Sequence, residues 1–209
     1  MIQKENVRMS NVITPESPLF HADFAKLAEV TKSLDAGVEL EEKAFLGHLN
    51  LRGNASDEAF TSGVEKALGV ALPTAPCTSA QSDAVTILWL SPDEWLIIVD
   101  GGKEHETEAA LRANLTGHFA VSDVSGGQTI VRLAGSDSIN VLKKSMGYDT
   151  HIDNFPVGKV IGTAFSKTSC HMLRTAETEF LMVVRRSFAD YMWLWLQQAS
   201  KEYGLKVIA

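Results

Sequence analysis

The stretch from Leu88 to Asp100 constrains the fold more than any other part of the chain. It reads Leu-Trp-Leu-Ser-Pro-Asp-Glu-Trp-Leu-Ile-Ile-Val-Asp, so two short apolar runs flank a Ser-Pro-Asp turn. Proline presets φ at the second position of a β-turn, and an aspartate side chain bonds the backbone there. Val, Ile, Leu and Trp in short runs favour strands. We therefore expect a largely buried β-hairpin, with Trp89 and Trp95 on either side of its turn.

The segments around this hairpin predict an order of strand, helix, hairpin, helix and strand. Asn54 is a good N-cap residue, and Gly69 suits the left-handed position that follows a helix. The expected elements are a strand over 38–51, a helix between Asn54 and Gly69, a helix over 104–115 and a strand over 118–124.

The same order then repeats in the second half of the chain. The pattern predicts a strand over 128–133, a helix capped by Ser136, strands over 159–166, 169–174 and 179–184, a helix over 188–203 capped by Ser187, and a strand over 205–208. Two split βαβ units of this kind predict an α+β fold with antiparallel sheets. We expect one domain over 21–209, made of halves at about 38–125 and 127–209.

The start of the chain follows a different pattern. Residues 1–20 are polar, contain two prolines and lack periodicity, which is typical of a flexible arm that is disordered alone or extended across a partner. A short amphipathic helix is expected next, over 24–34.

Composition restricts the class of partner. The net charge of -7 and the pI near 5.4 argue against binding to a nucleic-acid backbone, which needs a basic face. Cys77 and Cys170 lie far apart without metal-ligand spacing, so we expect two reduced thiols. The chain has no signal-peptide pattern and no apolar run of about 18 residues. These features predict a soluble cytoplasmic protein that binds neither nucleic acid nor a membrane.

No motif in the chain predicts catalysis or metal binding. The six histidines form no HxxxH or HExxH pattern, and no GxGxxG or Walker spacing is present. Asp123 with Ser122 and Ser125 has the side chains of a nucleophile site, but no GxSxG motif surrounds it. We therefore predict no catalytic residue, no metal ligand and no cofactor bound by this chain alone.

Several short segments, spread from about residue 45 to the end, carry a resemblance to a known family. They are Leu51-Arg-Gly53, Leu68-Gly-Val70 with Leu72-Pro73, Leu88 to Leu96, Val121-Ser-Asp-Val-Ser125, Val131-Arg-Leu-Ala-Gly135, and Arg185-Arg-Ser-Phe-Ala-Asp-Tyr191 with Trp193-Leu-Trp195. Together they resemble the gamma subunit of bacterial heterotetrameric sarcosine oxidase. The resemblance implies a fold like the N-terminal part of the folate-binding aminomethyltransferases, which contains two ferredoxin-like halves.

The resemblance also implies a function. The family's complex oxidatively demethylates sarcosine to glycine, forms hydrogen peroxide and transfers the one-carbon unit to tetrahydrofolate. FAD, FMN, NAD and zinc are implied for the complex, with alpha, beta and delta subunits as partners and the gamma subunit as a non-catalytic component. Similar gamma subunits occur in N-methylglutamate dehydrogenase complexes, so N-methylglutamate stays open as an alternative substrate. A stand-alone folate-binding protein and an interaction module of the same fold are further alternatives.

Two features near the C-terminus are candidates for a partner interface. Arg185 and Arg186 lie at a predicted strand-to-helix junction, where they would clamp a carboxylate or a folate tail, or form a solvated or inter-subunit ion pair. Trp193 lies about 200° around the final helix from Trp195, off the apolar stripe. That stripe comprises Phe188, Tyr191, Met192, Trp195 and Ala199. We therefore expect Trp193 to contact another subunit.

Overall fold

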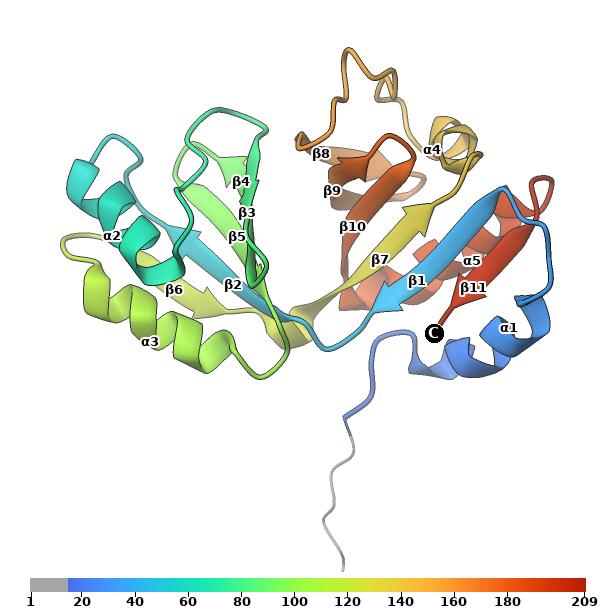
Figure 1. Cartoon of the computed structure of the whole chain (residues 1–209), viewed down its shortest axis with the longest axis horizontal. Helices are drawn as coiled ribbons and strands as arrows, with labels where there is room; N and C mark the ends of the chain where they lie inside the picture. Colours follow the sequence, from blue (N-terminus) through green and yellow to red (C-terminus); the bar gives the residue numbers. More distant parts are fainter. Residues whose placement is uncertain (1–14) are drawn as a thin grey trace, which may run out of the picture.

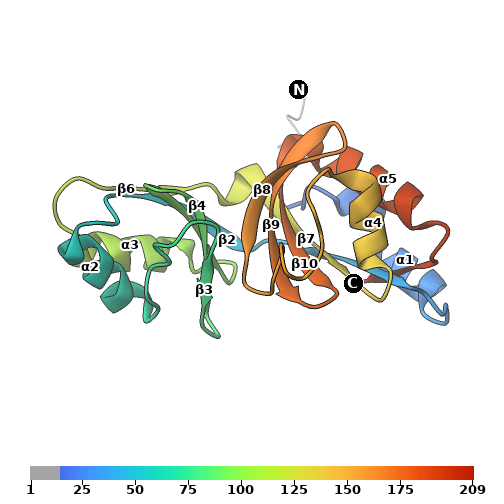
Figure 2. The ribbon, with the colours of Figure 1, turned by 90° about the horizontal axis from the view of Figure 1, so that it is seen from above.

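Two β-sheets lie face to face at the centre of the molecule, with helices on the outer side of each (Figures 1 and 2). The computed structural model describes residues 15–209. This layered α+β arrangement confirms the predicted fold class. Apolar residues alternate along most strands, so each sheet buries one face against its helices and part of the other against its neighbour.

The first sheet has five strands in the order β3-β4-β5-β2-β6. Helices α2 (Glu58–Leu68) and α3 (Glu104–Asn114) cover its outer face (Figure 1). Strands β4, β5, β2 and β6 reproduce the order of a split βαβ unit, and the sequence pattern missed only the short β3. The strand bounds are β2 (Gly47–Arg52), β3 (Ser79–Gln81), β4 (Val85–Ser91), β5 (Glu94–Val99) and β6 (Ala120–Asp123).

The hairpin of β4 and β5 has the predicted turn and register. Trp89 lies opposite Trp95 across the two strands. Trp95 is fully buried, packs its ring 5.9 Å from that of Phe60 and donates from Nε1 to the carbonyl of Pro73 at 2.8 Å. Trp89 is only half-buried. The hairpin therefore supplies one large core residue with a satisfied polar atom, which is how buried tryptophan is normally accommodated.

The second sheet has six strands in the order β11-β1-β7-β10-β9-β8. Helices α4 (Ser138–Ser145) and α5 (Ala189–Ser200) cover its outer face (Figure 2). The strand bounds are β1 (Val38–Lys43), β7 (Gln128–Ala134), β8 (Val160–Phe165), β9 (Thr168–Ala176), β10 (Glu179–Arg185) and β11 (Leu205–Ile208). A 3-10 helix, η2 (Ser125–Gly127), precedes β7, and another, η3 (Arg186–Phe188), lies between β10 and α5.

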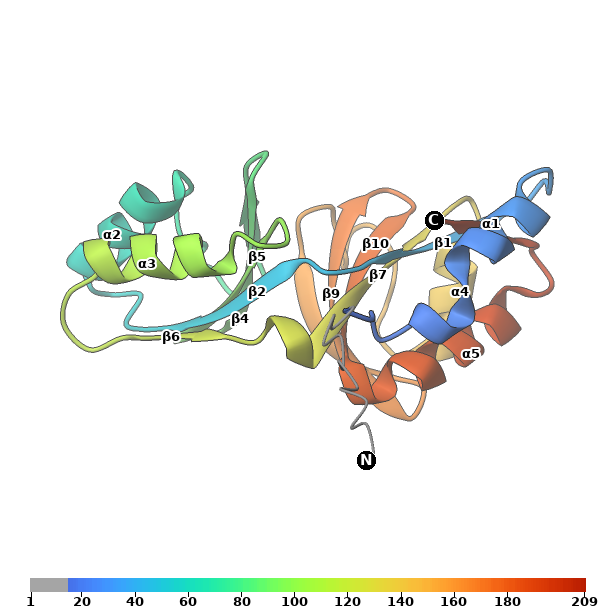
Figure 3. The ribbon, with the colours of Figure 1, turned by 90° about the horizontal axis from the view of Figure 1, so that it is seen from below.

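The expected single strand over 38–51 is wrong, because it is two strands in different sheets. β1 pairs with β7 and β11 in the second sheet, whereas β2 lies in the first. The chain turns between them at Phe45, whose φ of 58° is left-handed, and a Cβ on Gly101 would meet the Phe45 carbonyl oxygen at 2.2 Å. The predicted halves at 38–125 and 127–209 therefore interleave: residues 38–43 complete the sheet formed by the second half (Figure 3).

Three of the predicted helix caps lie elsewhere. Asn54 accepts from the backbone N–H of Ser56 in the preceding turn, and Asp57 is the N-cap of α2, accepting from Ala59 at 2.9 Å. Asp137 occupies the N-cap position of α4 in place of Ser136, and Phe188 that of α5 in place of Ser187. Gly69 ends α2 with a φ of 68°, as predicted.

A third apolar cluster joins the two sheets. Its members are Leu88, Leu96 and Ile98 from the first sheet and Ile130, Val160, Leu173 and Val183 from the second. The backbone of Thr78 also bridges to Lys159, and Val160 donates to the carbonyl of Cys77 at 2.8 Å. Both connections between the sheets, β1 to β2 and β6 to β7, cross at the same end (Figures 1 and 3). The sheets therefore form one packed unit.

The segment before β1 packs on the second sheet. It contains η1 (Phe20–Ala22) and α1 (Phe24–Thr31), which is shorter than the predicted 24–34. The predicted arm over 1–20 falls largely outside the described residues, but Leu19 is fully buried in the core of the second sheet. The last part of the predicted flexible arm therefore packs against the core at that residue.

Candidate functional site

A cleft of about 470 Å³ opens between the two sheets, and we call it the inter-sheet cleft. Its floor is apolar, with Leu90, Leu96, Val124 and Val183. The polar side chains that line it come from both sheets and are Asn50, Glu94, Gln128, Thr163, Ser169, His171 and Arg185. An apolar cleft with a few convergent polar groups is the usual form of a small-molecule site.

The strand register places Asn50 and Glu94 on one wall of this cleft. Asn50 lies opposite Leu96, so it shares a sheet face with Glu94, and its Nδ2 donates to Glu94 Oε1 at 2.7 Å. Arg185 ends β10 on the other wall, directly opposite Gln128 in β7. Among residues 15–209, Arg185 has no carboxylate within ion-pair distance.

His171 lines the same cleft. Burial is the main effect on the pKa of His171 and lowers it, while the charge of Glu94 raises it and that of Arg185 lowers it further. A Cβ on Gly162, in the neighbouring strand β8, would lie 3.4 Å from the imidazole, so the backbone of β8 comes close to the ring. The cleft therefore presents a carboxylate, a neutral imidazole and a guanidinium.

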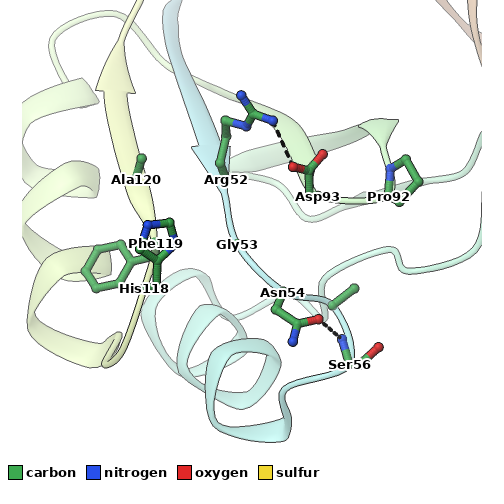
Figure 4. A pocket seen from close by; sticks show the side chains of 10 residues that line it. Arg52, Gly53, Asn54, Ser56, Pro92, Asp93, His118, Phe119 and Ala120 are labelled. Atoms are coloured by element: carbon green, nitrogen blue, oxygen red, sulfur yellow. Dashed lines mark hydrogen bonds and ion pairs between the residues drawn. The ribbon is translucent and has the colours of Figure 1, made fainter.

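A second hollow of about 820 Å³ lies at the outer end of the first sheet (Figure 4). Arg52 donates to Asp93 Oδ2 at 2.8 Å, and Ser91 donates to Asp93 Oδ1 at 2.7 Å. These two donors lower the pKa of Asp93, with the Ser91 hydroxyl first. In Figure 4, His118 and Phe119 lie apart from this ion pair. The Asp93 carboxylate therefore stabilises the hairpin turn and is not poised for acid or base chemistry.

The Asp123 and Ser125 pair forms a turn at the end of β6. Asp123 Oδ1 accepts from the backbone N–H of Ser125 at 2.9 Å and from its hydroxyl at 2.5 Å. The Ser125 hydroxyl accepts from the backbone N–H of His48 at 2.9 Å, and not from the imidazole. Ser122 is exposed on the same strand. The arrangement satisfies backbone groups of a turn, and no described histidine ring contacts the Ser125 hydroxyl as it would in a serine–histidine pair.

Sequence reasoning missed the buried polar atoms around His48. His48 is 1% exposed, and both of its ring nitrogens lack a partner among the described residues. Burial lowers the pKa of His48. It lines a third hollow of about 430 Å³ together with Glu104 and Gln128, whose Oε2 and Nε2 atoms are also buried without partners among residues 15–209. The alternation of side chains in β2 could have predicted the placement of His48. Leu49 and Leu51 point to one face of the strand, so His48 must point to the other.

The two neighbouring arginines point to different places. Arg185 lines the inter-sheet cleft, whereas Arg186 lines the hollow near His48 and donates to the carbonyl of Glu16 at 3.3 Å. They therefore do not form one clamp.

Trp193 is a core residue of this chain, so the expectation that it lies off the buried stripe of the final helix is wrong. It is 2% exposed, and the ring of Phe24 in α1 lies 4.7 Å from its own. Trp195, expected in the core, is half-buried and donates from Nε1 to Ser145 Oγ at 2.9 Å. The buried stripe of α5 is Ala189, Met192, Trp193, Leu196, Ala199 and Ser200. Helix α1 covers the side of α5 that the sequence pattern left open.

The described residues contain neither a membrane-spanning helix nor a metal-ligand cluster. None of their helices combines the length and apolarity needed to cross a membrane. Within residues 15–209, no three His, Cys, Asp or Glu side chains are grouped as metal ligands.

Comparison with known proteins matches residues 52–202 to the sarcosine oxidase, gamma subunit family. The chain belongs to this family. The sarcosine oxidase subunit gamma of Corynebacterium sp. (strain P-1) is 29% identical over 204 residues, covering 96% of this chain and 99% of the relative. That of Corynebacterium sp. (strain U-96) is 30% identical over 200 residues, covering 92% and 93%. The resemblance carried by the short segments is thereby confirmed.

Two solved structures share this fold. A chain of the heterotetrameric sarcosine oxidase from Corynebacterium sp. U-96 superposes with a TM-score of 0.82 at 27% identity, over 93% of this chain and 99% of that one. Aminomethyltransferase T of the glycine cleavage system from Bartonella henselae superposes with a TM-score of 0.59 at 11% identity, over 87% of this chain and 50% of that one. The second likeness confirms the expected aminomethyltransferase-like fold and nothing beyond the fold.

Proposed function

We propose that this chain is the gamma subunit of a heterotetrameric enzyme that oxidatively demethylates sarcosine to glycine. The reaction would form hydrogen peroxide and pass the one-carbon unit to tetrahydrofolate. The observation that carries the proposal is the correspondence over nearly the full length of both chains with gamma subunits of sarcosine oxidase. The partners would be alpha, beta and delta subunits.

We propose a non-catalytic role for the chain within that complex. The acidic and hydroxyl side chains that resemble catalytic groups, Asp93, Asp123 and Ser125, are engaged in turns of the protein itself. The described residues also do not fit the implied cofactors, because none of them form a metal-ligand cluster and the chain has no dinucleotide-binding glycine motif. FAD, FMN, NAD, zinc and tetrahydrofolate would then bind to the other subunits or between them.

The test is co-expression of the four subunits with and without this chain. We expect a complex that oxidises sarcosine, measured as sarcosine-dependent hydrogen peroxide, only when the chain is present. The purified chain alone should show no flavin absorbance and no oxidation of sarcosine. Oxidase activity of the chain alone, or full assembly and activity of the other three subunits without it, would contradict the proposal. Faster turnover of N-methylglutamate than of sarcosine would assign the chain to the related dehydrogenase complex.

A further inference from the structure

Glu94 and Arg185 face the same cleft without contacting each other. They lie on opposite walls, and the two charged groups are more than an ion-pair distance apart, since no ion pair of 4 Å or less joins them. Arg52, the residue opposite Glu94 on β2, is engaged by Asp93 at 2.8 Å. Two opposite charges in one cleft, each without a contacting counter-ion among residues 15–209, leave room for a ligand that carries both signs.

Each wall adds a neutral polar group suited to the charge beside it. Gln128 lies directly across from Arg185 in the sheet, and its Nε2 is buried with no acceptor among the described residues. A guanidinium and an amide N–H side by side are donors for a carboxylate. On the other wall, Glu94 keeps a carboxylate oxygen, Oε2, to which no described side chain donates, while Asn50 holds Oε1. A carboxylate held in this way accepts hydrogen bonds from an ammonium group.

We propose that the inter-sheet cleft binds a small free amino acid as its zwitterion, with the carboxylate at Arg185 and Gln128 and the ammonium at Glu94. His171 lines the same cleft, and its neutral ring offers one donor and one acceptor. The apolar floor of Leu96, Val124 and Val183 excludes water from the middle of the ligand. The inference does not rest on the proposed function.

The test uses the full-length chain and glycine as the probe, with acetate and methylammonium as its two halves. Isothermal titration should give saturable glycine binding, and Glu94→Gln and Arg185→Gln should each weaken it about tenfold or more. Arg185→Gln should abolish acetate binding and spare methylammonium, and Glu94→Gln should do the reverse. Arg186→Gln is the matched control, because it removes the adjacent charge outside the cleft and should change the glycine Kd less than about twofold.

A second measurement keeps the proposal falsifiable if a variant unfolds. In the unmodified chain, the imidazole NMR signals of His171, assigned with His171→Gln, should shift as glycine saturates the site. Glycine binding that leaves His171 unmoved or survives both cleft substitutions would overturn the proposal. Acetate binding as tight as glycine would replace the zwitterion site with a simple anion site, and no glycine binding in the millimolar range would remove it.

Discussion

His48 is a buried polar residue for which the described part of the chain provides no partner. Its ring lies at the seam between the first sheet and the residues around Pro15 to Pro18, and neither nitrogen has a partner among residues 15–209. A buried polar group left unpaired costs about 1–3 kcal/mol. That cost rises further if the ring must also carry a charge, which is why burial lowers the pKa of His48.

We predict that His48 makes the protein less stable as the pH falls below about 6.5, the ordinary value for an unfolded chain. Below that pH, His48 binds a proton in the unfolded chain but stays neutral in the native protein. The stability that His48 contributes is therefore complete above that pH and is lost on acidification. The slope from one such group is at most about 1.4 kcal/mol per pH unit. His48→Leu should reduce the slope of unfolding free energy against pH, measured in urea.

A control variant and the result for His48→Leu itself test that prediction. His105→Gln removes an exposed histidine on α3 and should leave the slope as it is. Retention of the full slope in His48→Leu would assign the acid sensitivity to another group, such as His171, whose pKa burial also lowers.

At the scale of elements, α1 decides what α5 buries. The stripe expected from the sequence places Trp195 inside and Trp193 outside, whereas the structure rotates the buried face toward Trp193. One side of α5 meets the second sheet, and α1 adds a further contact through Phe24. A helix that packs against two elements buries a wider stripe than a helix that packs against one.

We predict a measurable coupling between Phe24 and Trp193. Trp193→Ala should lower the free energy of unfolding by about 3–5 kcal/mol, because it removes a fully packed indole. A double-mutant cycle with Phe24→Ala should give about 0.5–1.5 kcal/mol of interaction energy. Phe20→Ala, 62% exposed in the same segment, is the control and should show no coupling. Strictly additive effects of Phe24 and Trp193 would mean that α1 does not stabilise the helix.

At the scale of the whole molecule, the two sheets depend on each other. The cluster of Leu88, Leu96 and Ile98 with Ile130, Val160, Leu173 and Val183 buries apolar surface of both. β1 also ties the N-terminal region into the second sheet, since it lies between β7 and β11. The second sheet would lack β1 without the first half of the chain, and the inner face of each sheet is covered by the other.

We predict that the protein unfolds in one cooperative transition and that Leu96→Ala destabilises both sheets. Leu96 is 3% exposed in the joining cluster, and its truncation should cost about 2–5 kcal/mol. Native-state hydrogen exchange should show faster opening of amides in β5 and in β10 alike. Leu194→Ala, on an exposed site of α5, is the control. Loss of protection confined to the first sheet would show that the two sheets unfold separately.

Features set by neighbours in the sequence could be predicted without the structure. The hairpin around Ser91 to Asp93, the left-handed Gly69, the repeated order of elements and the family segments all depend on local turn chemistry or periodicity. The same local signals placed the candidate serine and aspartate groups in turns at strand ends.

Only the tertiary structure decided which elements meet. Periodicity shows that a face is apolar, but it does not show what covers that face. The packing of Trp193 against Phe24 and the partial exposure of Trp195 therefore could not be predicted from the sequence. The break at Phe45 sends β1 to a partner, β11, at the far end of the chain. The cleft of Glu94, His171 and Arg185 has the same origin, because its walls come from distant strands that only the packing of two sheets brings together.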